Sequence, residues 1–196
     1  MKRNESMKKK PLLNEKIIEE FQDSYLEDLM KDYNTLKERS DEEVEDTINA
    51  FVKILKVLEY RKILFLGELL FNDSKLSYLY QKGKLPEDFN LFDNDKLLYS
   101  PLFSYMRPQG SKEEYKKYIV VVTSGKTLSY VKDNNFNYIE ETTIGELYKK
   151  YLIDNNDLDG IVINPLSNNF ILNKDMCKLI AEENTEDLMK KLNLFI

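Results

Sequence analysis

The chemistry open to this chain is narrow, because its 196 residues include no histidine. Histidine-activated nucleophiles, imidazole acid–base catalysis and histidine metal ligands are therefore excluded. Carboxylates, lysines, tyrosines and the single thiol of Cys177 remain. Cys177 lies in NKDMCKLIAEE, where Met176, Leu179 and Ile180 form the apolar face of an expected helix. We expect a packed thiol rather than a nucleophile, and we predict no catalytic residue and no enzyme activity.

The segment VVVTSGKT, residues 120–127, resembles the end of a phosphate-binding loop, since Gly125, Lys126 and Thr127 follow an apolar run. The first glycine of that motif would fall on Val120. A β-branched residue does not have the backbone freedom that cradling a phosphate requires. Ser124 is a natural helix N-cap. The segment therefore predicts a strand followed by a capped helix, and no nucleotide cofactor.

The segment DNNDLDG, residues 154–160, resembles the start of a calcium-binding loop, with Asn155, Asp157 and Asp159 at the first three ligand positions. The bidentate glutamate that closes such a loop would fall on Leu166. We therefore predict a polar loop between a helix and a strand, and no bound metal. A metal coordinated near Asp157 and Asp159 would instead indicate a carboxylate-dependent enzyme or a metal binder.

The segment LDGIVINPLSNNFIL, residues 158–172, places a polar turn between two apolar runs. Residues 161–163 predict a buried strand, and residues 170–172 predict a return strand. We expect Asn164 to hydrogen-bond within its own turn and Pro165 to end the first strand. Residues 167–169 carry the reversal. The segment predicts a structural corner rather than an active site.

Helices and strands predicted by the apolar pattern must position these segments. Residues 12–39 and 40–60 predict two amphipathic helices, the second opened by a capping box of Ser40 and Glu43. Strands are expected at 62–66, ending at Gly67, and at 97–103, 118–123, 137–141, 160–163 and 170–172. Helices are expected at 125–133, 142–153, 174–183 and 185–192, and loops at 72–95, with room for a short helix, and at 106–117. Pro101 ends its strand or confines it to an edge.

The predicted fold class is α+β (α/β-like), a small mixed sheet of about five strands packed with helices and preceded by an N-terminal helical arm. The chain divides into a disordered basic tail at 1–11, a helical region at 12–60 and an α/β domain at 61–196. Residues 1–10 carry a net charge of +4, residues 11–60 carry −8 and the whole chain carries −6. Because nucleic-acid affinity rests on clustered lysine and arginine, we expect no nucleic-acid partner.

The compartment is predicted from the apolar runs and the cysteine count. No apolar run reaches the ~18 residues that span a bilayer, so we expect no membrane insertion. A single cysteine permits no internal disulfide, so the reducing cytoplasm is the expected location.

Three segments resemble the N-terminal domain of the enhanced-serine-sensitivity family, abbreviated SseB: LYSPLF, VVTSGKTLSYV and DLDGIVINPLSNNFILNKDMCKLI. In that family's pattern a Pro-Leu/Val-Phe strand and a Thr-Ser segment precede an amphipathic helix. An Ile-Asn-Pro strand end, a polar turn, a return strand and a capped helix then follow, and residues 97–183 keep this order. The chain departs from the pattern in its acidic N-terminal helix and its insertions. The resemblance implies a small cytosolic bacterial α/β domain without an established catalytic centre.

The expected function is that of a non-enzymatic protein-interaction module that needs no cofactor. We predict Tyr138, Asn164 and Asn168 as partner-binding residues, and the tyrosines at 99, 105, 115, 118, 130 and 138 either add contact area or line the core. The alternative is a toxin-immunity or phage-encoded inhibitor protein that neutralises a protein partner. The acidic composition fits that role, and LPEDF at 85–89 resembles a segment of one immunity-protein family. The sequence leaves the partner's identity and the oligomeric state open.

Overall fold

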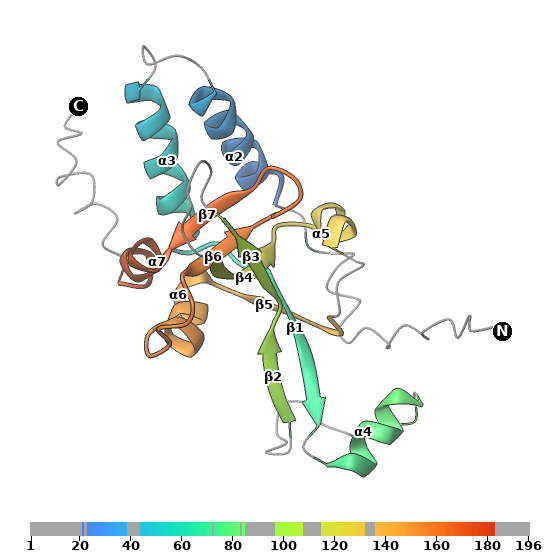
Figure 1. Cartoon of the computed structure of the whole chain (residues 1–196). Helices are drawn as coiled ribbons and strands as arrows, with labels where there is room; N and C mark the ends of the chain where they lie inside the picture. Colours follow the sequence, from blue (N-terminus) through green and yellow to red (C-terminus); the bar gives the residue numbers. More distant parts are fainter. Residues whose placement is uncertain are drawn as a thin grey trace.

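The computed structural model describes residues 21, 23–38, 44–71, 73–82, 84, 97–107, 115–131 and 136–182. In this part of the chain the helices are α2 (Ser24–Lys37), α3 (Val44–Leu58), α4 (Ser74–Gln81), α5 (Gly125–Val131), α6 (Ile144–Leu147), the π-helix η2 (Tyr148–Leu152) and α7 (Lys174–Ala181). The strands are β1 (Ile63–Phe71), β2 (Leu97–Pro101), β3 (Phe103–Met106), β4 (Lys116–Val122), β5 (Tyr138–Thr142), β6 (Gly160–Ile163) and β7 (Phe170–Asn173). The predicted α+β class is confirmed (Figure 1).

Four predicted features lie outside the described residues. They are the basic tail at 1–11, the capping box of Ser40 and Glu43, the LPEDF segment at 85–89 and the helix at 185–192. Within the described residues, none of the helices has both the length and the apolar character to span a membrane.

The strands form one mixed sheet whose main path runs β2-β1-β4-β6-β7, with β5 added to β1 and β3 to β4. Strands β4 and β6 are parallel, and the other described pairs are antiparallel. The sheet has seven strands rather than about five, partly because the strand predicted at 97–103 is divided in two. At the division, the N–H of Leu102 donates to the Leu66 carbonyl at 2.8 Å and its carbonyl accepts from the Val120 N–H at 2.8 Å. As a result β2 pairs with β1, whereas β3 pairs with β4.

Strand β1 continues to Phe71, so the predicted strand end at Gly67 is wrong. Gly67 pairs with Tyr138 on one side and Pro101 on the other. A Cβ at this position would lie 2.9 Å from the Ser100 carbonyl oxygen and 3.1 Å from the Phe65 ring. Glycine is therefore required by the close approach of a neighbouring strand rather than by a turn.

Helices cover both faces of the sheet (Figure 1). On one face α2, α3, α6, η2 and α7 pack against a cluster that includes Ile119 and Val121 of β4. On the other face Leu128 of α5 packs against a cluster that includes Val120 and Val122. Because successive side chains of a strand point to opposite faces, burial on both sides explains the uninterrupted apolar run of β4.

Helices α2 and α3 share the core of the sheet. Tyr33 of α2, Phe51 of α3 and Phe170 of β7 pack together, with ring centroids 5.4 to 5.8 Å apart. Aromatic pairs at such distances add to the stabilisation from burial. Leu26 and Met30 of α2 are fully buried in the same cluster. The described part of the helical region at 12–60 is therefore integral to the core.

The outer half of β1, together with β2 and α4, extends away from the helix layers (Figure 1). Helix α4 begins after Asp73, whose carboxylate accepts from the N–H groups of Lys75 at 2.8 Å and Leu76 at 3.1 Å. Tyr80 of α4 packs on Phe71 of β1, with ring centroids 5.1 Å apart. Helix α4 therefore occupies the first part of the loop predicted at 72–95.

Candidate functional site

Thr123, Ser124 and Asn164 lie together at the carboxyl ends of the parallel strands β4 and β6. After β4 the chain leads to α5 and then to β5 beside β1, whereas after β6 it turns into β7. In α/β sheets, ligands bind most often where the connections diverge in this way. On topology, this position is therefore a candidate for a ligand crevice.

Asn164 joins the ends of the two strands. Its backbone φ is 51°, a left-handed conformation that asparagine tolerates better than most residues. Its Oδ1 accepts from the Thr123 N–H at 3.0 Å, and its Nδ2 donates to Thr123 Oγ1 at 2.8 Å. The expected side-chain bond within its own turn is not formed, because the main chain closes the turn through the Ser167 N–H and the Asn164 carbonyl at 3.0 Å.

Helix α2 fills the crevice beside these residues. Glu27 Oε1 accepts from Thr123 Oγ1 at 2.8 Å and from Ser124 Oγ at 2.6 Å. The Asp23 N–H also donates to the Thr123 carbonyl at 3.1 Å. Leu26, which lies between Asp23 and Glu27, is fully buried in the core and holds α2 in place. A carboxylate of the chain itself therefore occupies the place where a ligand would bind, and this corner of the fold is structural.

The GKT residues are used in starting α5 rather than in forming a phosphate site. Ser124 Oγ accepts from the Thr127 N–H at 3.2 Å, as expected of the predicted N-cap. Thr127 Oγ1 donates to the Ser124 carbonyl at 3.0 Å. Lys126 is exposed, while Thr127 is buried. The hydroxyl that would meet a magnesium ion in a phosphate loop is therefore bonded within its own helical turn.

The acidic loop at 154–160 organises its own backbone. Asp159 Oδ2 accepts from the Lys117 N–H at 2.7 Å, and the Asp159 N–H donates to the Lys117 carbonyl at 2.9 Å. Asn155 Oδ1 accepts from the Asp157 N–H at 3.0 Å. In the described ranges of the chain, no three cysteine or carboxylate side chains are grouped so that they could hold a metal ion. The loop connects η2 to β6, and its polar side chains are explained by that connection.

Cys177 is a core residue of α7. Its side chain is fully buried, and Sγ lies 3.8 Å from the Leu172 carbonyl. Burial raises the pKa of the thiol to about 12.

Because the thiolate is the nucleophilic form, we expect iodoacetamide at pH 8 to alkylate the native protein about 100-fold more slowly than the urea-unfolded protein. Mass spectrometry of timed samples measures both rates, and rapid labelling of the native protein would contradict the prediction.

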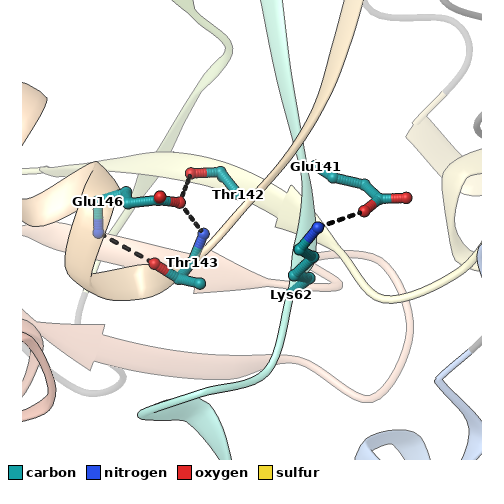
Figure 2. A network of polar contacts seen from close by, with 5 residues as sticks. All are labelled: Lys62, Glu141, Thr142, Thr143 and Glu146. Carbon is teal, nitrogen blue, oxygen red and sulfur yellow. Dashed lines mark hydrogen bonds and ion pairs between the residues drawn. The ribbon is translucent and has the colours of Figure 1, made fainter.

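A second set of polar contacts involves Lys62, which directly precedes β1, and residues at the end of β5 and the start of α6 (Figure 2). Thr143 Oγ1 accepts from the Glu146 N–H at 3.2 Å, and Glu146 Oε2 accepts from the Thr143 N–H at 2.9 Å, which completes a capping box. The same carboxylate oxygen accepts from Thr142 Oγ1 at 3.0 Å. Beside it, Lys62 Nζ pairs with Glu141 Oε2 at 3.2 Å. Helix capping and one surface ion pair account for this network.

The capping box should make stability sensitive to acid. The pKa of Glu146 is lowered, first by the Thr143 N–H and then by the Thr142 hydroxyl, which both donate to the carboxylate. A lowered folded-state pKa stabilises the fold above the unfolded-state value of about 4.3, and this contribution is lost as the pH falls through the folded-state value. Glu146→Gln should therefore be less stable than the wild type at pH 7, and the difference should shrink as the pH falls below the unfolded-state value and through the lowered folded-state value.

Urea unfolding at several pH values measures this difference. The matched control is Glu182→Gln, which removes an exposed carboxylate that lies 3.9 Å from Lys178 on α7. Exposed pairs of this kind contribute little, so we expect a change below about 0.5 kcal/mol. A stability loss in Glu146→Gln that stays constant between pH 7 and pH 3 would contradict the role of its carboxylate.

The three predicted partner-binding residues do not form one exposed surface. Tyr138 is 1% exposed in the core, where it pairs with Gly67 in the sheet, and Asn164 is 2% exposed. Asn168 is half-buried in the turn between β6 and β7. Tyr138 and Asn164 were expected at the surface, and the structure corrects this. Tyr138 packs in the core, and Asn164 bonds to Thr123 at the ends of β4 and β6.

A row of aromatic and cationic side chains lies on β3, on β4 and at the adjoining residues 107 and 115. The strand register places Tyr105 opposite Lys117 and Phe103 opposite Ile119. Lys117 Nζ lies 4.0 Å from the Phe103 ring centroid and 6.0 Å from that of Tyr105. Arg107 Cζ lies 4.6 Å from the Tyr115 ring centroid. The cation–aromatic ladder is defined as Phe103, Tyr105, Arg107, Tyr115 and Lys117.

The ladder begins at the core and ends in solvent. Ile119 is fully buried, and Phe103 packs against the cluster covered by the larger helix layer. Farther along the strands, Tyr105 is 62% exposed and Tyr115 is 60% exposed. The helix layer therefore stops before the outer rows of the ladder and leaves two aromatic side chains uncovered.

The sequence interpretation missed this arrangement. Of the tyrosines considered, Tyr118 and Tyr138 are buried and Tyr130 lies on α5, whereas Tyr105 and Tyr115 belong to the ladder. The alternation in FSYMR at 103–107 and YKKYI at 115–119 is the signal that indicates two paired strands with one aromatic face. Interpreting 106–117 as a loop separated the two halves of this pattern.

The fold and these sites define an α+β protein with a filled strand-end crevice and an exposed cation–aromatic ladder. No family model, curated protein or solved structure matches the chain. The resemblance to the SseB N-terminal domain therefore stays a prediction.

Proposed function

We propose that this chain is a non-enzymatic, cytoplasmic protein-interaction module of the SseB type, which contacts its protein partner through the cation–aromatic ladder. The observation that carries the proposal is the exposure of Tyr105 and Tyr115 beside Arg107. Tyrosine and arginine are among the side chains that contribute most to binding energy at protein interfaces. A tyrosine ring offers a large contact area and a polar hydroxyl at modest entropic cost.

The ladder is held on a rigid support, which favours binding. Phe103 is anchored against the core, and Lys117 has both its backbone N–H and its carbonyl bonded to Asp159, at 2.7 and 2.9 Å. Ordering side chains and loops at an interface costs free energy on association. A surface whose strands are already fixed avoids much of that cost.

The interior supports a binding role over a catalytic one. The crevice at the ends of β4 and β6 is filled by Glu27, and the polar groups there bond to one another. Cys177 is buried and has a raised pKa, which disfavours the reactive thiolate. The ladder, by contrast, presents exposed side chains suited to recognition.

Site-specific photo-crosslinking tests the proposal. A benzophenone amino acid placed at Tyr105, in the full chain produced in its native cells, should cross-link to one specific protein. The matched control places the same amino acid at Tyr130, which is also exposed, at 49%, but lies on α5 against the other face of the sheet. Position 130 should give little of the same product. Equal cross-linking at both positions, or none at position 105, would contradict the proposal.

A further inference from the structure

The cations of the ladder are not neutralised within the described chain. Ion pairs among the described residues include those of Arg61 with Asp23, Lys62 with Glu141 and Lys178 with Glu182, but neither Arg107 nor Lys117 takes part in one. Both ladder cations lie over aromatic rings instead. A cation above a ring keeps its charge and its N–H donors available to a third group. The chain as a whole carries a net charge of −6, but the two cations make this surface complementary to carboxylates.

The two cations occupy neighbouring rows on one face of the β3–β4 pair. Lys117 lies opposite Tyr105, and Arg107 follows Tyr105 by two residues. Two residues of a strand span about 6.6 Å. An extended partner segment repeats its side chains on one face at the same interval. Carboxylates at alternate positions of such a segment would therefore meet both cations, with Arg107 able to bind its carboxylate through two parallel hydrogen bonds.

We infer that the ladder binds an extended protein segment that carries acidic side chains at alternate positions. The inference rests on the proposed function and specifies the chemistry of its partner. The exposed rings of Tyr105 and Tyr115 would contact the intervening residues and the stems of the acidic side chains.

A nucleic-acid strand fits this surface less well. Single-stranded nucleic acid also stacks on exposed aromatic rings, but its affinity depends on a groove lined by many cations along the phosphate backbone. The ladder contributes two cations, and the carboxylate of Asp159 is bonded to the backbone of one of them, Lys117. A short acidic peptide needs no more positive charge than this.

Fluorescence anisotropy with labelled probes and the full chain tests the inference. The probes are an octapeptide of alternating threonine and glutamate, an isomer that repeats the order threonine-threonine-glutamate-glutamate, and an oligothymidylate of the same length. We expect the alternating peptide to bind about threefold more tightly than the isomer, because only the alternating peptide carries glutamates two residues apart, which lie on one face of an extended segment at the spacing of the two cations. The oligothymidylate should bind more weakly than the alternating peptide.

Neutral variants identify the surface. Arg107→Gln and Lys117→Gln should each weaken binding of the alternating peptide about threefold, and the double variant about tenfold. The matched control is Lys116→Gln, which makes the same charge change on the same strand. Lys116 pairs with Met106, whose side chain packs toward the opposite face, so this variant should bind like the wild type.

Each of the other outcomes overturns the inference. Equal losses in Lys116→Gln and Lys117→Gln would show non-specific attraction, and tighter binding of the oligothymidylate would indicate a nucleic-acid ligand. If the acidic peptide does not bind while position 105 cross-links to a protein, the partner chemistry is wrong and the proposed function stands. If both experiments fail, the ladder is not an interaction surface.

Discussion

Replacing Gly160 with alanine is expected to lower the free energy of unfolding by about 4 kcal/mol, because strained backbone and a steric clash act together. Gly160 begins β6 with a φ of 153°, a conformation that residues with a Cβ rarely adopt. A Cβ there would collide with the Leu172 carbonyl oxygen and lie 3.0 Å from Asn173 Cα. Both obstacles are backbone atoms of β7, so the clash can be relieved only by separating β6 from its partner strand.

Urea unfolding followed by circular dichroism measures the loss. Gly145→Ala is the matched control, because Gly145 is helical and a Cβ there would lie 3.4 Å from Ala181 Cα, an ordinary contact. Alanine is favoured over glycine in helices by about 0.5 to 1 kcal/mol, so this variant should be neutral or slightly more stable. A Gly160→Ala protein as stable as Gly145→Ala would show that β7 moves aside at little cost.

Replacing Asn164 with alanine is expected to lower the free energy of unfolding by about 3 kcal/mol. The change removes both hydrogen bonds to Thr123 and leaves a buried backbone N–H without its acceptor, which costs about 1 to 3 kcal/mol. It also places alanine at a φ of 51°, which adds roughly 1 kcal/mol. Thr123 in turn donates to Glu27, so the loss should also loosen α2 from the sheet.

Two further variants separate the contribution of the hydrogen bonds from that of the left-handed backbone. Asn164→Gly keeps the left-handed backbone accessible and removes only the hydrogen bonds, so it should cost about 1 kcal/mol less than Asn164→Ala. Asn168→Ala is the control, because Asn168 is half-buried in the same turn, and it should change stability by less than about 0.5 kcal/mol. If Asn164→Ala and Asn168→Ala unfold at the same urea concentration, the proposed role of Asn164 is wrong.

Sequence reasoning succeeded where burial repeats along the chain. The predicted strand at 160–163 and the predicted helix at 174–183 correspond to β6 and α7, because a short continuous apolar run indicates a buried strand and apolar residues three or four apart indicate a helix with one buried face. It failed at Gly67, where glycine was taken to end a strand. Glycine is needed there because the carbonyl of Ser100, on a strand more than 30 residues away, leaves no room for a Cβ. The local sequence pattern contains no information about that contact.

In the candidate sites, too, local features were predicted from the sequence and contacts between distant segments were not. The Asn-Pro corner was predicted to be structural, and Asn164 does close β6, but its hydrogen-bond partner is Thr123 rather than its own turn. The ladder was not predicted, because its rows are formed by residues from two strands on either side of a presumed loop. Which side chains share a face is decided by strand register, and register depends on the pairing of the folded sheet.

By itself the sequence determined that this chain has no histidine chemistry, that its elements form an α+β fold and that the chain turns sharply after residue 163. The tertiary structure alone decided that Asn164 is a buried link, that Glu27 fills the crevice and that aromatic and cationic side chains meet on an exposed face. The physical reason is the range of the interactions. Periodicity and turn preference act over a few residues, whereas the hydrogen bond between Glu27 and Thr123 joins residues 96 positions apart and exists only after the chain has folded.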